Sequence, residues 1–139
     1  MILVDTNVVS EPLRRTPEPC VADWLDAQAL ETLYLSAITV AELRFGVQAL
    51  PDGQRRNRLH EDLEQQVLPM FAGRVLAFDL AASQAYAELM AKAQSAYWTI
   101  SISDGYIAAT AAANAMMVAT RDTAPFEAAG LKTVDPWAA

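Results

Sequence analysis

Four carboxylates stand where a mostly parallel sheet would expose side chains together. Asp5 and Asp122 each follow a short apolar run that is typical of a buried strand, whereas Glu42 and Asp104 lie near the starts of two expected helices. Several anions held within a few ångströms repel one another unless a cation neutralises them. Oxygen ligands favour hard cations such as Mg²⁺ or Mn²⁺. The set would therefore suit metal-assisted hydrolysis of a phosphodiester.

Each acid also has a structural explanation that the sequence leaves open. Asp5 could cap a short turn that follows its strand. The stretch 39–42 (TVAE) fits a capping box, in which Glu42 bonds back to the helix start, and local sequence alone favours that role. Asp104 could sit in a first helical turn because the helix dipole favours an anion there. Asp122 could be an ordinary turn aspartate.

The hydrophobic pattern predicts the elements that would position these acids. Strands alternate with helices, which indicates one α/β domain over residues 1–139, with a mostly parallel sheet and helices on both faces. The carboxyl ends of parallel strands meet at one edge, where ligand crevices form. The expected strands cover 1–4, 32–36, 75–78, 117–119 and 131–134, and the main helices cover 17–28, 39–50, 54–68 and 101–114. A further helix is expected after Asp79, which can cap it, with Leu89, Met90 and Ala93 buried.

Composition limits the classes of protein to consider. A chain of 139 residues that is 53% hydrophobic suits one domain with one core. The single Cys20 excludes an internal disulfide, and one Cys with one His does not supply the ligands that zinc favours. No apolar run reaches the roughly 18 residues of a membrane span. No signal peptide is recognisable, so we expect a cytoplasmic protein without a membrane partner.

The charge argues against a generic nucleic-acid binder, which would be basic. Formal net charge is −7, but if four acids hold a divalent cation, the rest of the chain carries −7 + 4 = −3. Positive charge is also concentrated locally, because Arg55, Arg56 and Arg58 stand close to His60. A solvated helix face is the simpler explanation of this stretch.

At these acids the sequence resembles PIN-domain ribonucleases of the VapC type, the toxins of bacterial toxin–antitoxin pairs, and especially their FitB-like branch. The resemblance implies a single PIN domain over residues 1–139. It also implies that Asp5, Glu42, Asp104 and Asp122 form the family's acidic metal site. It rests on four stretches that occur in the family's order across nearly the whole chain, namely ILVDTNV (2–8), LSAITVAEL (35–43), SDGYIAAT (103–110) and VATRDT (118–123).

The resemblance further implies Mg²⁺- or Mn²⁺-dependent endonuclease activity on RNA, homodimerisation, and inhibition by a cognate antitoxin of the VapB or FitA type. In the FitB-like branch the complex with the antitoxin binds operator DNA. A catalytically weak PIN module that serves mainly as the antitoxin's partner is therefore the alternative. Asn7 and Thr120 match positions where the family uses small polar side chains to hold the acids. Arg121 could contact phosphate or be an ordinary surface arginine.

The chain departs from its relatives at Tyr97-Trp98-Thr99, where many carry Gly, a basic residue and Pro. We expect these aromatic side chains to pack in the core rather than to offer a stacking face to a base. Two other classes fit less well. A haloacid-dehalogenase-like phosphatase needs an Asp two positions after the first, where this chain has Asn7. A receiver domain needs an acidic pair and a late lysine, and only Lys132 is available.

Overall fold

The computed structural model describes residues 1–139 and contains the parallel sheet that the strand pattern predicts, with the strands in the order β3-β2-β1-β4-β5. β1 is central and pairs with both neighbours through Leu3, which lies opposite Tyr34 on one side and Val118 on the other. All pairings are parallel. The strands are β1 (Ile2–Val4), β2 (Leu33–Ser36), β3 (Val75–Leu76), β4 (Met117–Ala119) and β5 (Thr133–Val134).

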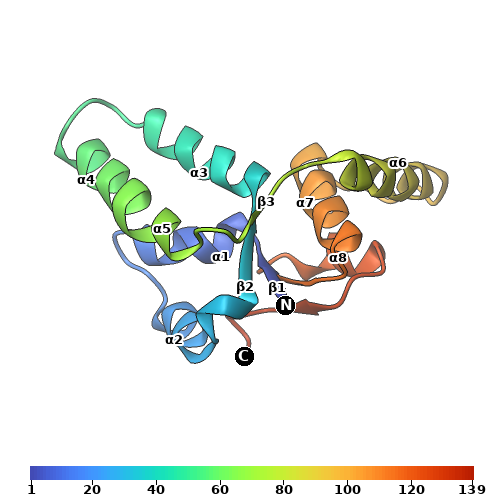
Figure 1. Ribbon diagram of the computed structural model, residues 1–139, viewed down its shortest axis with the longest axis horizontal. Coiled ribbons are helices and arrows are strands. Elements are labelled where there is room, and N and C mark those ends of the chain that lie inside the picture. Colours follow the sequence, from blue (N-terminus) through green and yellow to red (C-terminus); the bar gives the residue numbers. More distant parts are fainter.

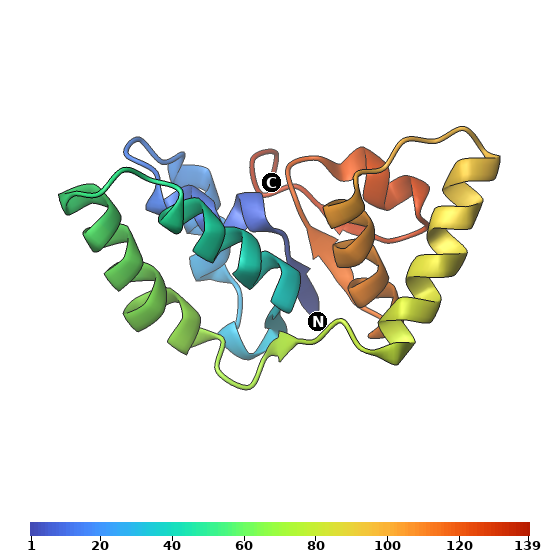
Figure 2. The same cartoon turned by 90° about the horizontal axis from the view of Figure 1, so that it is seen from above.

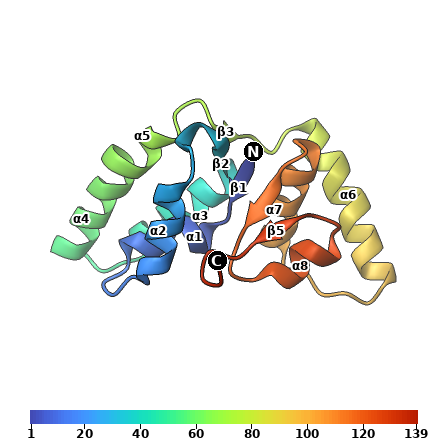
Figure 3. The ribbon, with the colours of Figure 1, turned by 90° about the horizontal axis from the view of Figure 1, so that it is seen from below.

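Helices cover both faces of the sheet, which Figure 1 shows edge-on. The chain between β1 and β3 supplies the helices on one side, and the chain after β3 supplies those on the other, an arrangement that is also clear from above and below (Figures 2 and 3). The helices are α1 (Thr6–Ser10), α2 (Pro19–Ala27), α3 (Ala37–Gln48), α4 (Gln54–Asp62), α5 (Leu68–Met70), α6 (Leu80–Ser95), α7 (Ile102–Ala113) and α8 (Thr123–Ala128).

The sheet separates two hydrophobic clusters because successive side chains of a strand point to opposite faces. Val4 belongs to the cluster that includes residues of α1–α4, whereas its neighbour Leu3 packs with Ile107 and Phe126 on the side of α6–α8. All four side chains are at most 1% exposed. Both faces of β1 are therefore buried, and the polar residues that follow it are held against a rigid frame.

The start of α3 differs from the sequence prediction. The helix begins at Ala37 instead of Thr39, because the Ser36 hydroxyl at the end of β2 accepts a hydrogen bond from the backbone N–H of Thr39. Both hydroxyl residues could cap a helix. Thr39 is instead fully buried within the first turn. Glu42 therefore lies in the second turn of α3, and the predicted capping box at 39–42 is wrong.

Three other predictions about local structure are wrong. The helix expected over 54–68, which Pro69 should end, continues beyond that proline, because a π-helical segment (Leu63–Val67) leads into α5, whose second residue is Pro69. Helix α8 was not expected from the sequence, although Asp122 starts it. Tyr97 is 97% exposed and does not pack in the core, whereas Trp98 is half-buried. No helix of the chain is long and apolar enough to cross a membrane.

Candidate functional site

The candidate site lies at the carboxyl ends of β1 and β4. The connection that leaves β1 runs to one side of the sheet, whereas β4 is reached from the other side, so the strand order reverses between these two neighbours. Crevices of doubly wound sheets form outside such a switch point. Asp5 follows β1 directly, and Thr120 and Asp122 follow β4. The backbone N–H of Asp5 donates to the carbonyl of Ala119 at 2.9 Å, which ties the two ends together.

Asp5 is buried and its charge is poorly solvated. Its Oδ1 accepts from the N–H of Thr6 at 2.8 Å, which makes it the N-cap of α1, and its Oδ2 accepts from the Thr120 hydroxyl at 2.8 Å. Only 4% of the residue is exposed. Burial, together with the nearby charges of Asp104 and Glu42, raises the pKa of Asp5 to about 6, although these two hydrogen bonds lower it. One side chain thus caps a helix and faces other acids.

Glu42 is held at the site by a hydrogen bond from Thr6, a residue that the sequence pattern did not indicate. The Thr6 hydroxyl donates to Glu42 Oε1 at 2.8 Å and lies 3.1 Å from the Thr39 hydroxyl. Because a hydroxyl has one proton, Thr6 must accept from Thr39 while it donates to Glu42. The sequence signal that could have indicated Thr6 was the expected parallel pairing of β1 with β2. That pairing places the residue after Asp5 beside the start of α3.

Asp104 and Asp122 complete the group of acids. Asp104 lies in the first turn of α7, where its backbone N–H donates to the capping hydroxyl of Ser101 at 3.2 Å. Burial raises the pKa of Asp104, and the charges of Asp122 and Glu42 add to that increase. Asp122 is exposed and starts α8 without a hydrogen bond from its side chain to the helix. Asp104 thus links the group, because it interacts electrostatically with Asp5, Glu42 and Asp122.

Polar neighbours join the two strand ends. Thr120 is fully buried, and its hydroxyl accepts from the N–H of Asp122 at 3.2 Å while it donates to Asp5. The amide of Asn7 bridges the same ends, with Nδ2 3.5 Å from the Thr120 hydroxyl and Oδ1 3.4 Å from the N–H of Arg121. The Arg121 guanidinium lies 5.0 Å from the ring centroid of Trp137, in a cation–π arrangement.

The donor chemistry suits a hard divalent cation, because the four side chains offer only carboxylate oxygens. The buried Asp5, whose pKa is raised to about 6, shows that the site disfavours uncompensated negative charge. As they stand, however, no three Asp, Glu, His or Cys side chains are grouped so that they could hold one ion. Mutual repulsion keeps bare carboxylates apart, and a cation would have to draw them together.

The Thr120 hydroxyl is expected to stabilise both strand ends. Thr120→Val keeps the side-chain shape but leaves a buried oxygen of Asp5 without its donor, so we expect a loss of about 1–3 kcal/mol in the free energy of unfolding at pH 7. The pKa of Asp5 should also rise further, because the hydrogen bond from Thr120 lowers it. Urea unfolding measures the loss. Thr120→Ser should recover most of the lost free energy of unfolding. Equal stability of the original protein and both variants would contradict a stabilising role of the Thr120 hydroxyl.

Stability should fall as the pH rises from about 4 to about 6. Asp5 has an ordinary pKa of 3.8 and a folded-state pKa of about 6, so the folded protein binds more protons within this window. The change amounts to at most about 3 kcal/mol, since one pKa unit corresponds to about 1.4 kcal/mol. Urea unfolding in EDTA across this range measures it. Asp5→Asn should remove most of this dependence of the free energy of unfolding on pH. If the dependence is the same in the variant, other titrating groups cause it.

Comparison with known proteins identifies the family. A parallel α/β sheet with acids at its switch point defines a class of proteins suited to metal-assisted chemistry on phosphates. A family model described as PIN domain matches residues 2–131. The chain therefore belongs to the PIN-domain family.

The chain is similar over nearly its whole length to curated toxins and ribonucleases. It is 60% identical over 137 residues to VapC ribonuclease Y4jK of Sinorhizobium fredii, covering 99% of this chain and 98% of that protein. It is 53% identical over 137 residues to Toxin FitB of Neisseria gonorrhoeae, covering 99% of each. A solved structure of FitAB bound to an IR36 DNA fragment superposes with a TM-score of 0.95 at 52% identity, covering 99% of this chain and 96% of that one.

Proposed function

We propose that this protein is the toxin of a type II toxin–antitoxin system and acts as a divalent-metal-dependent endoribonuclease. The observation that carries the proposal is a group of four carboxylates from separate elements near the sheet's switch point, linked electrostatically through Asp104, in a chain of the PIN-domain family. The names of its relatives support ribonuclease and toxin activity. The substrate is RNA, and the bond hydrolysed is its phosphodiester.

Asp5, Glu42, Asp104 and Asp122 would hold the cation, either Mg²⁺ or Mn²⁺. When bound, the cation would lower the pKa of a water molecule and offset charge that develops on the phosphate. Asp5 is held in place by its cap to α1 and by the Thr120 hydroxyl, so it needs little reorganisation. Glu42 is oriented by Thr6 from the neighbouring helix. Such hydrogen bonds to ligating side chains fix their direction and increase the affinity for the metal.

We infer the partners from the relatives. The solved FitAB assembly on DNA supports a cognate antitoxin that inhibits this protein and carries it to operator DNA. The whole chain, residues 1–139, would form one PIN domain, which acts as a homodimer in the cytoplasm where its RNA substrate is found. Arg121, held against Trp137 beside the acids, would contact a phosphate of the substrate.

Metal-dependent cleavage of RNA tests the proposal directly. Antitoxin-free protein is incubated with structured RNA in Mg²⁺, Mn²⁺ or EDTA, beside Asp104→Asn. We expect cleavage with the metals only and a loss of at least about tenfold in the variant, because an amide is a weaker ligand than a carboxylate. Glu127→Gln is the matched control, since Glu127 is exposed and bonds Thr133 instead of the site. Cleavage that survives both EDTA and Asp104→Asn would exclude the metal-dependent mechanism.

A second candidate function is a catalytically weak PIN module that acts mainly as the antitoxin's partner in an operator-binding complex. The similarity to the DNA-bound FitAB assembly favours it. The same experiment separates the two functions. Binding of Mn²⁺, measured by calorimetry, without cleavage of any RNA would favour the weak module, whereas metal-dependent cleavage supports the nuclease.

A further inference from the structure

A cleft of about 540 Å³ opens between the segment that follows α1 and one face of α4. Four arginines, called here the cleft arginines, line it: Arg14 and Arg15 on one wall, Arg55 and Arg58 on the other. Only two of its nine lining residues are hydrophobic, and none is aromatic. This is a polar cleft with two cationic walls, and it lies outside the group of acids at the sheet's switch point.

The cleft concentrates positive charge in an acidic protein. It holds four of the ten Lys and Arg residues and one acid, Asp62, so its lining carries +4 − 1 = +3. The formal net charge is −7, so the rest of the chain carries −7 − 3 = −10. A solvated helix face, the simpler explanation of the arginine-rich stretch, does not account for arginines that converge from a second segment about 40 residues away in the sequence.

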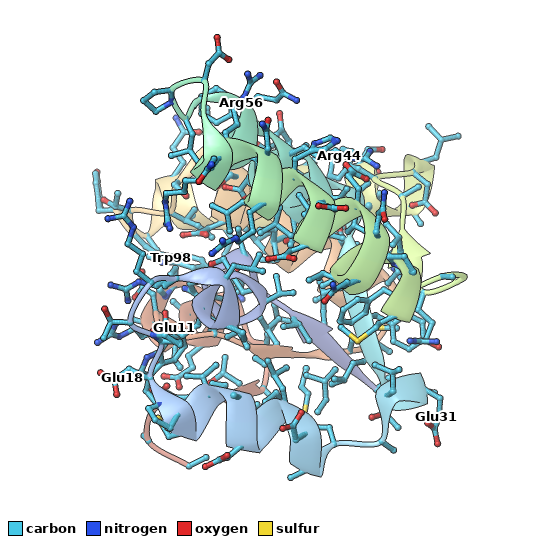
Figure 4. All side chains as sticks on the ribbon, turned by 90° about the vertical axis from the view of Figure 1, so that its left-hand side faces the viewer. Glu11, Glu18, Glu31, Arg44, Arg56 and Trp98 are labelled. Carbon is cyan, nitrogen blue, oxygen red and sulfur yellow. The ribbon has the colours of Figure 1, made fainter.

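Most of this charge has no partner within the protein. Among the cleft arginines only Arg14 forms an ion pair, at 3.2 Å from Glu11. Two arginines that do not line the cleft differ, since Arg56 pairs with Asp52 and Arg44 pairs with Glu64 at 2.7 Å. Figure 4 looks onto this side of the molecule, with Arg56 near the start of α4 and Glu11 in the segment after α1. Unpaired guanidinium groups on facing walls are suited to bind an anion bidentately.

The start of α4 adds to the attraction for an anion. Gln54, its first residue, lines the cleft, so the helix begins there. The N-cap residue Gly53 makes no side-chain capping bond, and the first turn contains no acid. The first backbone N–H groups of α4 are therefore left without a side-chain acceptor, and the helix dipole places further partial positive charge at the cleft.

We propose that the cleft arginines bind backbone phosphates of the RNA substrate a few nucleotides from the bond that is cut. This inference rests on the proposed ribonuclease function. α1 and the 3₁₀ turn Glu11–Leu13 connect Asp5 to Arg14, and their helical rise puts the two about 14 Å apart along the chain. With no aromatic residue to stack on a base, the cleft holds the backbone and adds affinity without sequence preference.

Binding of a short fluorescein-labelled single-stranded RNA, followed by anisotropy, tests the inference. The measurement is made in EDTA, so that it does not depend on cleavage. Arg55→Gln with Arg58→Gln should weaken binding about tenfold. Loss of two phosphate contacts should also make the dependence of log affinity on log salt less steep. The magnitude of that slope should fall by about 1.4, at roughly 0.7 per contact for a single strand. Both effects should be the same for RNAs of different sequence.

Arg56→Gln is the matched control. It removes one positive charge from the same helix, but Arg56 is already paired with Asp52 and does not line the cleft. The affinity of the Arg56→Gln variant for RNA should stay within about twofold of the affinity of the original protein. Because Arg55 and Arg58 make no ion pair, the double variant should also melt at the original temperature, which separates a binding defect from a folding defect.

Two results would overturn the inference. One is unchanged RNA affinity and salt slope in the double variant. The other is unchanged RNA affinity together with lost binding of a poly-glutamate peptide, which would make the cleft a site for an acidic protein segment. Cleavage assays keep the two proposals apart. A double variant that cleaves and binds RNA normally contradicts only the cleft, whereas cleft-dependent binding without any cleavage contradicts only the ribonuclease function.

Discussion

Asp5→Asn is expected to reduce metal-dependent RNA cleavage by at least about 100-fold while making the protein more stable. Mutating residues that merely support a metal ligand already reduces affinity or activity about 10- to 100-fold, and Asp5 would be a ligand itself. The stability gain has a separate cause. Asp5 is 4% exposed and its pKa is raised to about 6, so the folded protein at pH 7 holds a poorly solvated charge that asparagine removes.

Thermal melts with and without Mg²⁺ connect the two effects. In EDTA, Asp5→Asn should melt above the original protein. Excess Mg²⁺ should stabilise the original protein through binding to the folded state, and it should have little effect on the variant. Asp23→Asn serves as the control, because Asp23 is an exposed acid on α2 with no role at the site. A variant that is both less stable and still responsive to Mg²⁺ would show that Asp5 is not a ligand.

Phe126→Ala is expected to reduce the free energy of unfolding by about 3–5 kcal/mol, the usual loss for a buried phenylalanine. Phe126 is fully buried and packs with Leu3, Ile107 and Val118 on the side of α6–α8. It is the only buried residue of α8, so it fixes that helix to the sheet. Since Asp122 starts α8, loosening the helix should also weaken the metal dependence of stability.

Urea unfolding of Phe126→Ala measures this loss. Phe126→Leu should lose only roughly half as much free energy of unfolding, because it leaves a smaller cavity. The chain offers a matched control in Phe45, which is 73% exposed on α3. Phe45→Ala should change stability by less than about 0.5 kcal/mol. If the two alanine variants lose similar amounts, the hydrophobic cluster does not hold α8 in the way described.

The sequence by itself determined the class of fold and the residues worth testing. Short apolar runs that each end in a polar residue predict buried parallel strands, and this prediction is confirmed by the sheet order and its registers. Local pattern suffices here because the period of buried side chains belongs to the strand itself. It also selected Asp5 and Asp122, since a strand's end can be read locally. Their roles as metal ligands stay predictions.

Tertiary structure decided what competing local signals left open. Ser36 and Thr39 could each cap α3, and burial of Thr39 against Thr6 selects Ser36. That choice moves Glu42 out of a capping box and into contact with a residue 36 positions away. Local sequence cannot encode such a contact, because it depends on which strands are neighbours in the sheet.

The arginine-rich stretch shows the same limit. The sequence presents Arg55, Arg56 and Arg58 as one local concentration of charge. The fold pairs Arg56 with Asp52 and brings the other two to Arg14 and Arg15 across a cleft. Composition and periodicity therefore determined the fold class and the candidate acids. Only the packing of distant segments decided that Arg14 and Arg15 face Arg55 and Arg58 across a cleft, because electrostatic interaction depends on distance in space rather than along the chain.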